Sequence, residues 1–389
     1  MTAPCDAPEK KRGTIRLFLC GDVMLGRGID QVLQQPCDSA LHEDYVTSAL
    51  DYVRLAETAN GPIPRCASAR YVWGAALEEL SFAKPDLRIV NLETSITRAE
   101  DYDPKGINYR VSPENADCLL AAQIDCCALA NNHVLDWGKA GLLETVSALQ
   151  RLGIASVGAG RNAIEAAAPA VLPLQDSGRV LVYSFASATS GTPNRWAATS
   201  DRAGINLLRD LSETSARRIS SRISDDCRAG DIVVVSVHWG PNWGYEINSE
   251  QREFAHILLD SDRISVIHGH SSHHAKAIEL YGNGLILYGC GDFLNDYEGI
   301  SGYKSYRGDL SLMYFVTIER ATTAVLGVEI VPLQVRRFRL VRTAHVDVDW
   351  IQRTLERESR RFATRIIRRD DRHLSACLDQ HFVELDPPQ

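Results

Sequence analysis

Short runs of consecutive apolar residues recur along the chain and alternate with amphipathic stretches. They lie at residues 15–20, 87–92, 125–130, 180–185, 232–238, 264–270 and 285–293. Because successive positions in each run are apolar, both faces of the predicted strands are expected to be buried, as in the layered sheets of α/β proteins. Segments typical of helices lie between several runs, as at 139–153 and 215–223. The pattern therefore predicts an α/β fold.

The same pattern predicts the domain organisation. Residues 14–345 are expected to form a single domain, because no linker, repeat or low-complexity segment divides them. Apolar runs at 311–319 and 324–341 indicate a late antiparallel addition. Residues 1–13 are expected to be a disordered leader, and residues 346–389 a C-terminal helical extension packed on the domain.

Composition and charge exclude several classes of protein. With 389 residues, 45% of them hydrophobic, the chain is long enough for a full core. A net charge of −8 argues against nucleic acid as a partner. No signal peptide is recognisable, and no window reaches the roughly 18 apolar residues of a membrane span. We therefore expect a cytoplasmic protein with no membrane partner, whose ten cysteines are mostly reduced thiols in the core; the oligomeric state stays open.

Polar residues with metal-binding side chains follow six of the apolar runs. The segments are GDVMLGR (21–27), NLE (91–93), ANNHVLDWG (130–138), HWGPNWGYE (238–246), GHSSHH (269–274) and GDF (291–293). In open α/β sheets, functional groups gather at the carboxyl ends of the strands. Carboxylate oxygens and imidazole nitrogens suit Mn, Fe or Zn better than Ca²⁺. Two such ions about 3.5–4 Å apart hold a hydroxide for in-line attack on phosphorus, so the pattern predicts a hydrolase with a divalent metal cofactor, expected to be two ions.

These motifs, in this order, resemble those of the CapA-type family, which is named for poly-γ-glutamate capsule biosynthesis. That family belongs to the calcineurin-like metallophosphoesterase superfamily. The resemblance covers roughly residues 15–340. It implies a four-layer α/β/β/α sandwich of the metallophosphoesterase type, with a metal crevice at the strand ends.

The resemblance also implies roles for individual residues. The expected metal ligands are Asp22, the bridging carboxylate Glu93, Asn132, His238, His270 and His273. His133 is expected to protonate a leaving oxygen as a general acid. Asp136 either orients His133 or hydrogen-bonds the turn. In the histidine-rich segment 266–276, His268 is expected to lie behind the ligands or in the core, and His274 has no assigned role.

Two departures from the superfamily pattern leave open whether one or two ions bind. The superfamily commonly has Asp-x-His in its first motif, but Met24 stands at the third position here. A thioether is a poor ligand for a hard dication. The last motif is usually Gly-His-x-His, whereas this chain has Ser272 at the second His position and His273 one residue later.

A second group of residues is expected to bind an anionic substrate, either a small molecule or an oligomer. Guanidinium groups match phosphate and carboxylate, which favours Arg27 and Arg110, although both also fit a role as surface charges. Trp239 and Trp243 flank His238 and either wall the pocket or pack in the core. Glu246 is expected to support the site from behind.

Three hypotheses for the function follow. In the first, the protein is a metal-dependent phosphoesterase in which a metal-bound hydroxide attacks the ester and His133 is the general acid. The second keeps the metal site but applies it to a γ-glutamyl or other amide bond, as a hydrolase or a ligase-associated enzyme. In the third, the protein is a non-catalytic accessory in polyglutamate or other biosynthesis.

Overall fold

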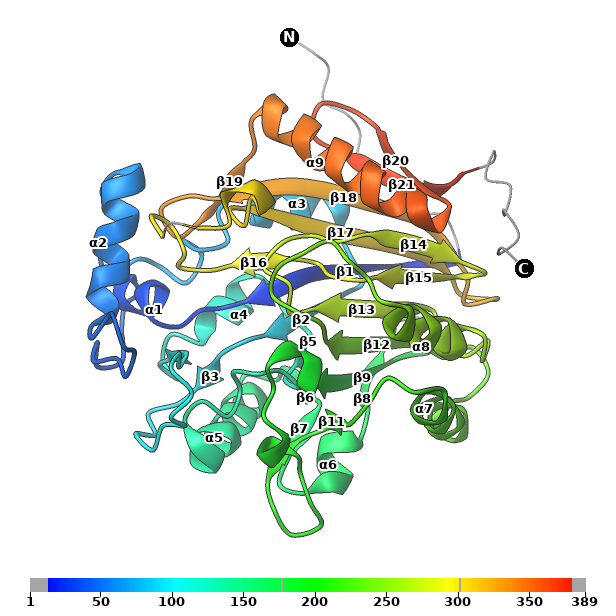
Figure 1. The fold of residues 1–389 in the computed structure, drawn as a ribbon, viewed down its shortest axis with the longest axis horizontal. Coiled ribbons are helices and arrows are strands. Elements are labelled where there is room, and N and C mark those ends of the chain that lie inside the picture. The colour runs from blue at the N-terminus through cyan, green and yellow to red at the C-terminus, as the bar shows by residue number, and fades with distance from the viewer. Residues whose placement is uncertain (1–12, 176–177, 301, 380–389) are drawn as a thin grey trace.

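The computed structural model describes residues 13–175, 178–300 and 302–379 (Figure 1). Two large sheets pack face to face, and helices cover the outer face of each. The fold is therefore the four-layer α/β/β/α sandwich that the family resemblance implies. Residues 1–12 of the expected leader and residues 380–389 of the expected extension lie outside the described residues.

The first sheet has ten strands, of which β1, β2, β5 and β6 are parallel and the rest of the main path is antiparallel. Its spatial order is β20 (Thr364–Arg368), β21 (Leu374–Leu378), β18 (Val325–Val335), β17 (Leu310–Glu319), β1 (Thr14–Val23), β2 (Leu87–Leu92), β5 (Cys126–Ala128) and β6 (Ala155–Val157), with β16 (Asp292–Leu294) beside β1 and β19 (Leu340–Arg342) beside β18.

The second sheet has seven strands, and β9, β12, β13 and β15 run parallel at its centre. Its order is β11 (Leu207–Leu208), β9 (Arg179–Ser187), β12 (Ile232–His238), β13 (Val266–His270), β15 (Gly284–Leu287) and β14 (Ile278–Tyr281), with β8 (Ala170–Pro173) beside β9. Two short pairs complete the strands, β3 (Ser95–Ile96) with β4 (Arg110–Val111) and β7 (Ala159–Gly160) with β10 (Gly204–Ile205).

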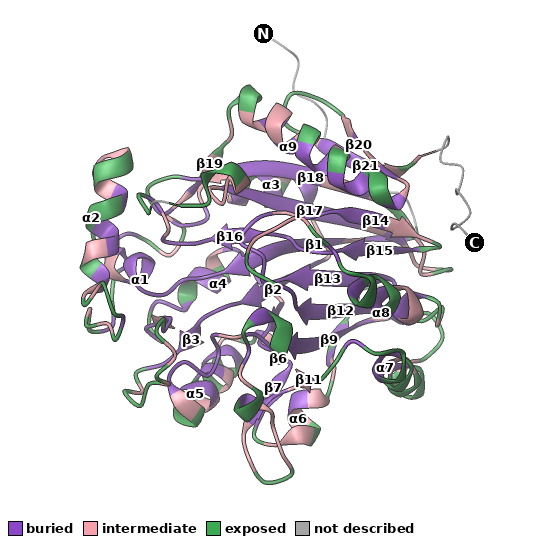
Figure 2. Cartoon of the chain, in the orientation of Figure 1, coloured by how far each residue is buried: buried purple, intermediate pink, exposed green. Residues whose placement is uncertain are grey.

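Successive side chains of a strand point to opposite faces of the sheet, and both faces are buried here, which explains why the apolar runs are continuous. Leu17 of β1 lies in the core between the sheets, and its neighbour Phe18 lies in the core beneath the outer helices. In β12, Val234 faces the first sheet, whereas Val233 faces helices on the other side. Both faces of the central strands are thus buried, as Figure 2 shows.

Helices cover the two outer faces. The first sheet is covered by helices α1 (Gly28–Val32), α2 (Ala49–Asn60), α3 (Ala76–Ala83), α4 (Asp117–Ala121) and α5 (Gly138–Arg151). The second sheet is covered by α7 (Glu213–Asp226) and α8 (Ser249–Leu259), which lie beside it in Figure 1. The short helix α6 (Ala163–Ala167) lies against β7 and β10.

The C-terminal region differs from the expected helical extension. Helix α9 (His345–Ser359) is followed by the β20–β21 hairpin, which pairs with β18 and widens the first sheet. Ile366 and Ala376 of this hairpin join the core between the sheets. These strands are short, and Arg365 and Arg368 interrupt the apolar pattern of the first, so the sequence pattern did not indicate a hairpin. Among the described residues, no helix is long and apolar enough to cross a membrane.

Candidate metal centre

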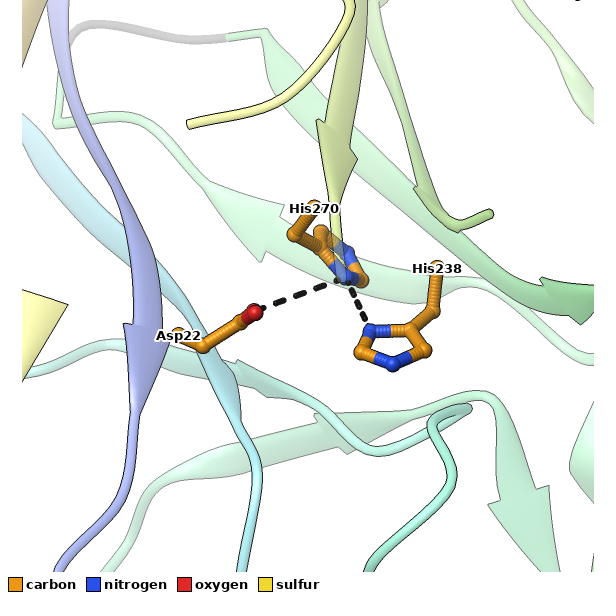
Figure 3. A group of neighbouring side chains, drawn as sticks. All are labelled: Asp22, His238 and His270. Carbon is orange, nitrogen blue, oxygen red and sulfur yellow. Dashed lines mark hydrogen bonds and ion pairs between the residues drawn. The ribbon is translucent and has the colours of Figure 1, made fainter. Parts of the chain in front are cut away.

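Three of the predicted ligands meet at the edge where strands of both sheets end. Asp22 belongs to β1 of the first sheet, and His238 and His270 are the last residues of β12 and β13 in the second. His238 and His270 are register partners, so their side chains leave the sheet side by side. One ligand atom from each of the three residues lies within 4.8 Å of the others (Figure 3). All three side chains are buried.

The ring nitrogens of the two histidines are oriented by neighbouring groups. Nδ1 of His270 lies 2.8 Å from Nδ1 of His238 and 3.8 Å from Oδ1 of Asp22. Its other nitrogen, Nε2, lies 2.7 Å from the hydroxyl of Ser236, which is two residues before His238 on the same face of β12. With the Nε2 proton donated to Ser236, Nδ1 presents its lone pair toward Asp22 and His238.

Glu93 and Asn132 approach the other side of His238. Nε2 of His238 lies 3.1 Å from Oδ1 of Asn132 and 3.7 Å from Oε1 of Glu93. The preceding Asn131 shapes the turn after β5, since its side-chain oxygen accepts hydrogen bonds from the amides of His133 and Val134. The structure therefore brings five of the six predicted metal ligands together in one cluster.

His133 lies next to this cluster and is held by Asp136. Its Nδ1 donates to Oδ2 of Asp136 at 2.6 Å, and its Nε2 lies 3.8 Å from Oε1 of Glu93. Asp136 also accepts a hydrogen bond of 2.6 Å from the amide of Tyr109. Of the two alternatives left open by the sequence, the structure shows the first: the side chain of Asp136 contacts the imidazole of His133, and its bond to a backbone amide goes to Tyr109 of a distant segment and not to its own turn.

Sequence reasoning missed Lys105, which lies in the loop between β3 and β4. Its ammonium group pairs with Oδ1 of Asp136 at 2.9 Å and donates to the carbonyl of Asn132. It also lies 3.2 Å from Nδ1 of His133. The loop carries no motif, so nothing in the sequence indicated that this lysine reaches the site.

His273, the sixth predicted ligand, is placed apart from the others. Its Nδ1 lies 2.9 Å from Oδ1 of Asp292, and its Nε2 lies 3.1 Å from the side-chain nitrogen Nδ2 of Asn242. Asp292 is the register partner of Asp22 on the adjacent parallel strand β16. Both nitrogens of His273 are thus engaged outside the group formed by Asp22, His238 and His270. The GDF motif was the signal for Asp292.

Met24 packs where the superfamily has a histidine ligand. Its side chain is buried, and its sulfur accepts a hydrogen bond of 3.6 Å from the hydroxyl of Tyr297.

His268 is a core residue, since its Nε2 lies 2.7 Å from the carbonyl of Cys20 and links the two sheets. His274 packs against the rings of Tyr245 and Tyr306.

Burial and crowding shift the pKa values of the clustered groups. Burial, together with the nearby Asp292, raises the pKa of Asp22 to about 7. Burial and the charge of Asp22 raise the pKa of Glu93 well above its ordinary value. Burial, followed by the neighbouring imidazoles, lowers the pKa of His238 and His270. Neutral imidazoles and mutually repelling carboxylates are the combination that a bound cation stabilises.

The structure does not present the two predicted arginines to a substrate. The guanidinium of Arg27 is buried and donates to Asp296, Glu43 and Tyr52. Four of its five N–H groups are engaged in these bonds. Arg110 instead stacks 3.8 Å from the ring of Trp137 and donates to a backbone carbonyl.

The two tryptophans differ. Trp239 is a core residue: it is 2% exposed, and its indole N–H donates 2.9 Å to the carbonyl of Tyr288. The expectation that it walls the pocket is wrong. Trp243 is half-buried and lines a large cavity together with His273. Glu246 is exposed, and its backbone carbonyl accepts a bond from Lys276.

Comparison with known proteins settles the family. Residues 16–297 match the family model described as bacterial capsule synthesis protein PGA_cap. This chain belongs to the PGA_cap family. The resemblance to CapA-type proteins that the motifs indicate is therefore confirmed.

Three relatives and one solved structure illustrate how far the likeness to this PGA_cap member extends. A probable polyglutamine synthesis accessory protein of Mycobacterium tuberculosis is 44% identical over 359 residues, covering 92% of this chain and 94% of the relative. The PGA biosynthesis protein CapA of Bacillus subtilis is 25% identical over 71% of this chain and 62% of its own. The capsule biosynthesis protein CapA of Bacillus anthracis is 24% identical, with coverages of 85% and 70%. A Mycoplasma pneumoniae crystal structure called a novel phosphatase aligns with a TM-score of 0.43 and 11% identity, covering 82% of this chain and 94% of that one.

Proposed function

We propose that this PGA_cap protein is a metal-dependent hydrolase that cleaves phosphate esters. The observation that carries the proposal is the buried convergence of Asp22, His238 and His270 from three strands in two sheets. Burying a carboxylate against other carboxylates costs free energy unless a counter-charge is present. Packing of the surrounding side chains does not offset that cost, whereas binding of a cation does.

The donor set fits a divalent transition metal. Asp22, Glu93, Asn132, His238 and His270 are the residues proposed to hold it, and they offer oxygen and imidazole donors suited to Mn, Fe or Zn. Oε2 of Glu93 is buried and has no hydrogen-bond partner among the described residues, which leaves it available as a ligand. When bound, such a cation supplies Lewis-acid activation of water and of a phosphoryl oxygen.

The residues around His133 have a distinct task in this proposal. Asp136 accepts the Nδ1 proton, which fixes the ring so that Nε2 faces Glu93 and the ligand cluster. In its imidazolium form, which carries a second proton at Nε2, His133 would donate that proton to a departing ester oxygen. Burial and the nearby Lys105 lower the pKa of His133, so the ring gives up this proton readily. Lys105 keeps Asp136 in place through its ion pair.

Metal analysis combined with a hydrolysis screen tests the proposal. The purified full chain, loaded in excess Mn²⁺, Fe²⁺ or Zn²⁺ and then desalted, is expected to retain stoichiometric metal and to release phosphate from at least one monoester or diester. The variants Asp22→Asn and His238→Ala are expected to lose the metal, while the matched control His345→Ala, an exposed histidine, keeps it. Absence of retained metal in the wild type overturns the proposal.

An accessory role in polymer synthesis is the second candidate, and the names of the relatives favour it. The mycobacterial protein is called a polyglutamine synthesis accessory protein, and the Bacillus subtilis relative a PGA biosynthesis protein. If the protein binds metal but hydrolyses no phosphate ester in the screen, γ-glutamyl amides are the next substrates to test. Inertness toward both bond types, with metal bound, would support the accessory role.

A further inference from the structure

A cavity of about 920 Å³ lies beside the candidate metal centre. It is lined by Tyr109, whose ring centroid lies 4.3 Å from that of His133. It is also lined by His273, which contacts Asp292 next to Asp22. Its volume is in the range of sites that hold a ligand of drug-like size. None of its lining has a part in the proposed function so far.

The mouth of this cavity is unusually apolar for a protein surface. Among the described residues, thirteen large apolar side chains are exposed, and five of them line this single cavity. The five are Tyr45, Leu55, Ile107, Ile300 and Tyr303. Single exposed apolar residues are normal, but a cluster around a cavity marks a surface that a ligand covers. These residues come from widely separated parts of the chain, so local sequence does not explain the cluster.

Two cations in the lining of the cavity are available to an anion. The lining carries Arg27, Lys304, Arg307 and Arg336, but Arg27 is paired with Glu43 and Asp296, and Arg307 with Asp309 and Asp347. Lys304 and Arg336 have no ion-pair partner among the described residues. Cations without a partner at a cleft attract anions. The cavity therefore combines an apolar mouth with two cations that can meet a negative charge.

We propose that this cavity binds the non-reacting part of the substrate, and that the substrate is an amphiphilic phosphate ester with a long apolar group. The proposal rests on the proposed phosphoesterase function. The phosphate end would lie at the metal centre beside His133, and the apolar group would cover Tyr45, Leu55 and Ile107 at the mouth. Lys304 and Arg336 would attract the anionic substrate electrostatically, without contacting a specific atom of it.

A homologous series of alkyl phosphates tests the proposal. Butyl, hexyl and octyl phosphate are kept below the concentrations at which they aggregate. KM is expected to fall by roughly twofold to fourfold for each added methylene, as expected for half to full removal of that group from water. kcat is expected to change little, because the alkyl group of the substrate makes the same contacts in the ground state and the transition state.

Surface variants show whether the effect belongs to this cavity. The double variant Tyr45→Ser/Ile107→Ser is expected to lose most of the dependence of KM on chain length while keeping its metal. The matched control Ile164→Ser, which alters an 80% exposed apolar residue outside the lining, is expected to keep it. Lys304→Gln/Arg336→Gln is expected to raise KM by a similar factor for all members of the series. The proposal is overturned if chain length has no effect in the wild type, or an equal effect in the double variant.

Binding of the corresponding alkylphosphonates, measured by calorimetry, separates this proposal from the function on which it rests. These compounds are not hydrolysed, so the dependence of their affinity on the length of the alkyl chain reports the cavity independently of catalysis. If affinity rises with chain length but no ester is cleaved, the cavity assignment stands and the phosphoesterase assignment fails. If esters are cleaved without any dependence on chain length in either measurement, the cavity assignment fails alone.

Discussion

Replacing Asp22 by asparagine is expected to make the metal-free protein more stable at pH 8, although it removes a central ligand. Asp22 is buried beside Asp292 and Glu93. With an ordinary pKa of 3.8 and a folded-state pKa of about 7, ionising this carboxyl costs the folded state up to about 4 kcal/mol. Asparagine cannot ionise, so the cost disappears.

The substitution also removes a hydrogen bond. Asp22 accepts from the side chain of Asn91 at 2.7 Å and from the amide of Ser271 at 3.1 Å. Asparagine has a single side-chain acceptor, so one bond is lost, which destabilises by about 1 kcal/mol. The expected net gain at pH 8 is therefore about 1–3 kcal/mol.

The difference in stability between the two proteins depends on pH. Because the folded-state pKa of Asp22 is raised, the folded protein holds its proton more tightly than the unfolded chain does. Stability of the wild type is therefore lost as pH rises from about 4 to 7, and the advantage of the variant grows over that window. At pH 4.5 the advantage is expected to be close to zero.

Urea unfolding of both proteins in excess chelator, at pH 4.5 and pH 8, measures the effect. A useful control is Asp231→Asn, because the ion pair of Asp231 with Arg179 lowers the pKa of Asp231 against the effect of burial. That variant is expected to be destabilised at pH 8. Adding Mn²⁺ should stabilise the wild type and reverse its rank against Asp22→Asn. If Asp22→Asn is the less stable protein at pH 8 without metal, the electrostatic account of the site is wrong.

Three further substitutions probe other parts of the molecule. Ser236→Ala removes the hydroxyl that orients His270, so metal affinity is expected to drop about 10–100-fold by calorimetry, and loss of this buried hydrogen bond is expected to destabilise the metal-free protein by about 1 kcal/mol. Asp136→Asn leaves His133 without its carboxylate partner, and kcat for any ester cleaved is expected to fall about 100-fold with metal content preserved. His373→Gln tests a site far from the metal: the carboxylate of Glu79, 3.6 Å away, and the hydrogen-bonded carboxylate of Asp370 raise the pKa of His373 to about 9, so its contribution of about 1–2 kcal/mol is expected below pH 6.5 and lost as pH rises through 9. Equal destabilisation of that variant at pH 6 and pH 10 would refute the last expectation.

Much of the fold and the ligand cluster could be predicted because both depend on local sequence features. A continuous apolar run such as 232–238 specifies a strand buried on both faces, and its last residue, His238, necessarily lies at the strand end. The ends of β1, β2, β5, β12 and β13 then meet at one edge, together with Asp292 at the start of β16. The β20–β21 hairpin was missed because its pairing with β18 depends on the tertiary context.

The errors concern residues whose surroundings come from distant parts of the chain. Arg27 looked available for a substrate, but Asp296, 269 positions later, closes around its guanidinium. Trp239 follows a strand end, yet its ring packs in the core between the second sheet and helix α8, beside Phe254. Lys105 reaches His133 from a loop without any motif. Such long-range partners leave no pattern in the sequence near the residue itself.

The most direct test of the metal centre is anomalous X-ray scattering from crystals grown with Mn²⁺. A strong anomalous peak is expected within about 2.0–2.4 Å of a carboxylate oxygen of Asp22 and of ring nitrogens of His238 and His270. Its absence in crystals of His238→Ala would support the assignment. Wild-type crystals without a peak at these three residues would contradict it.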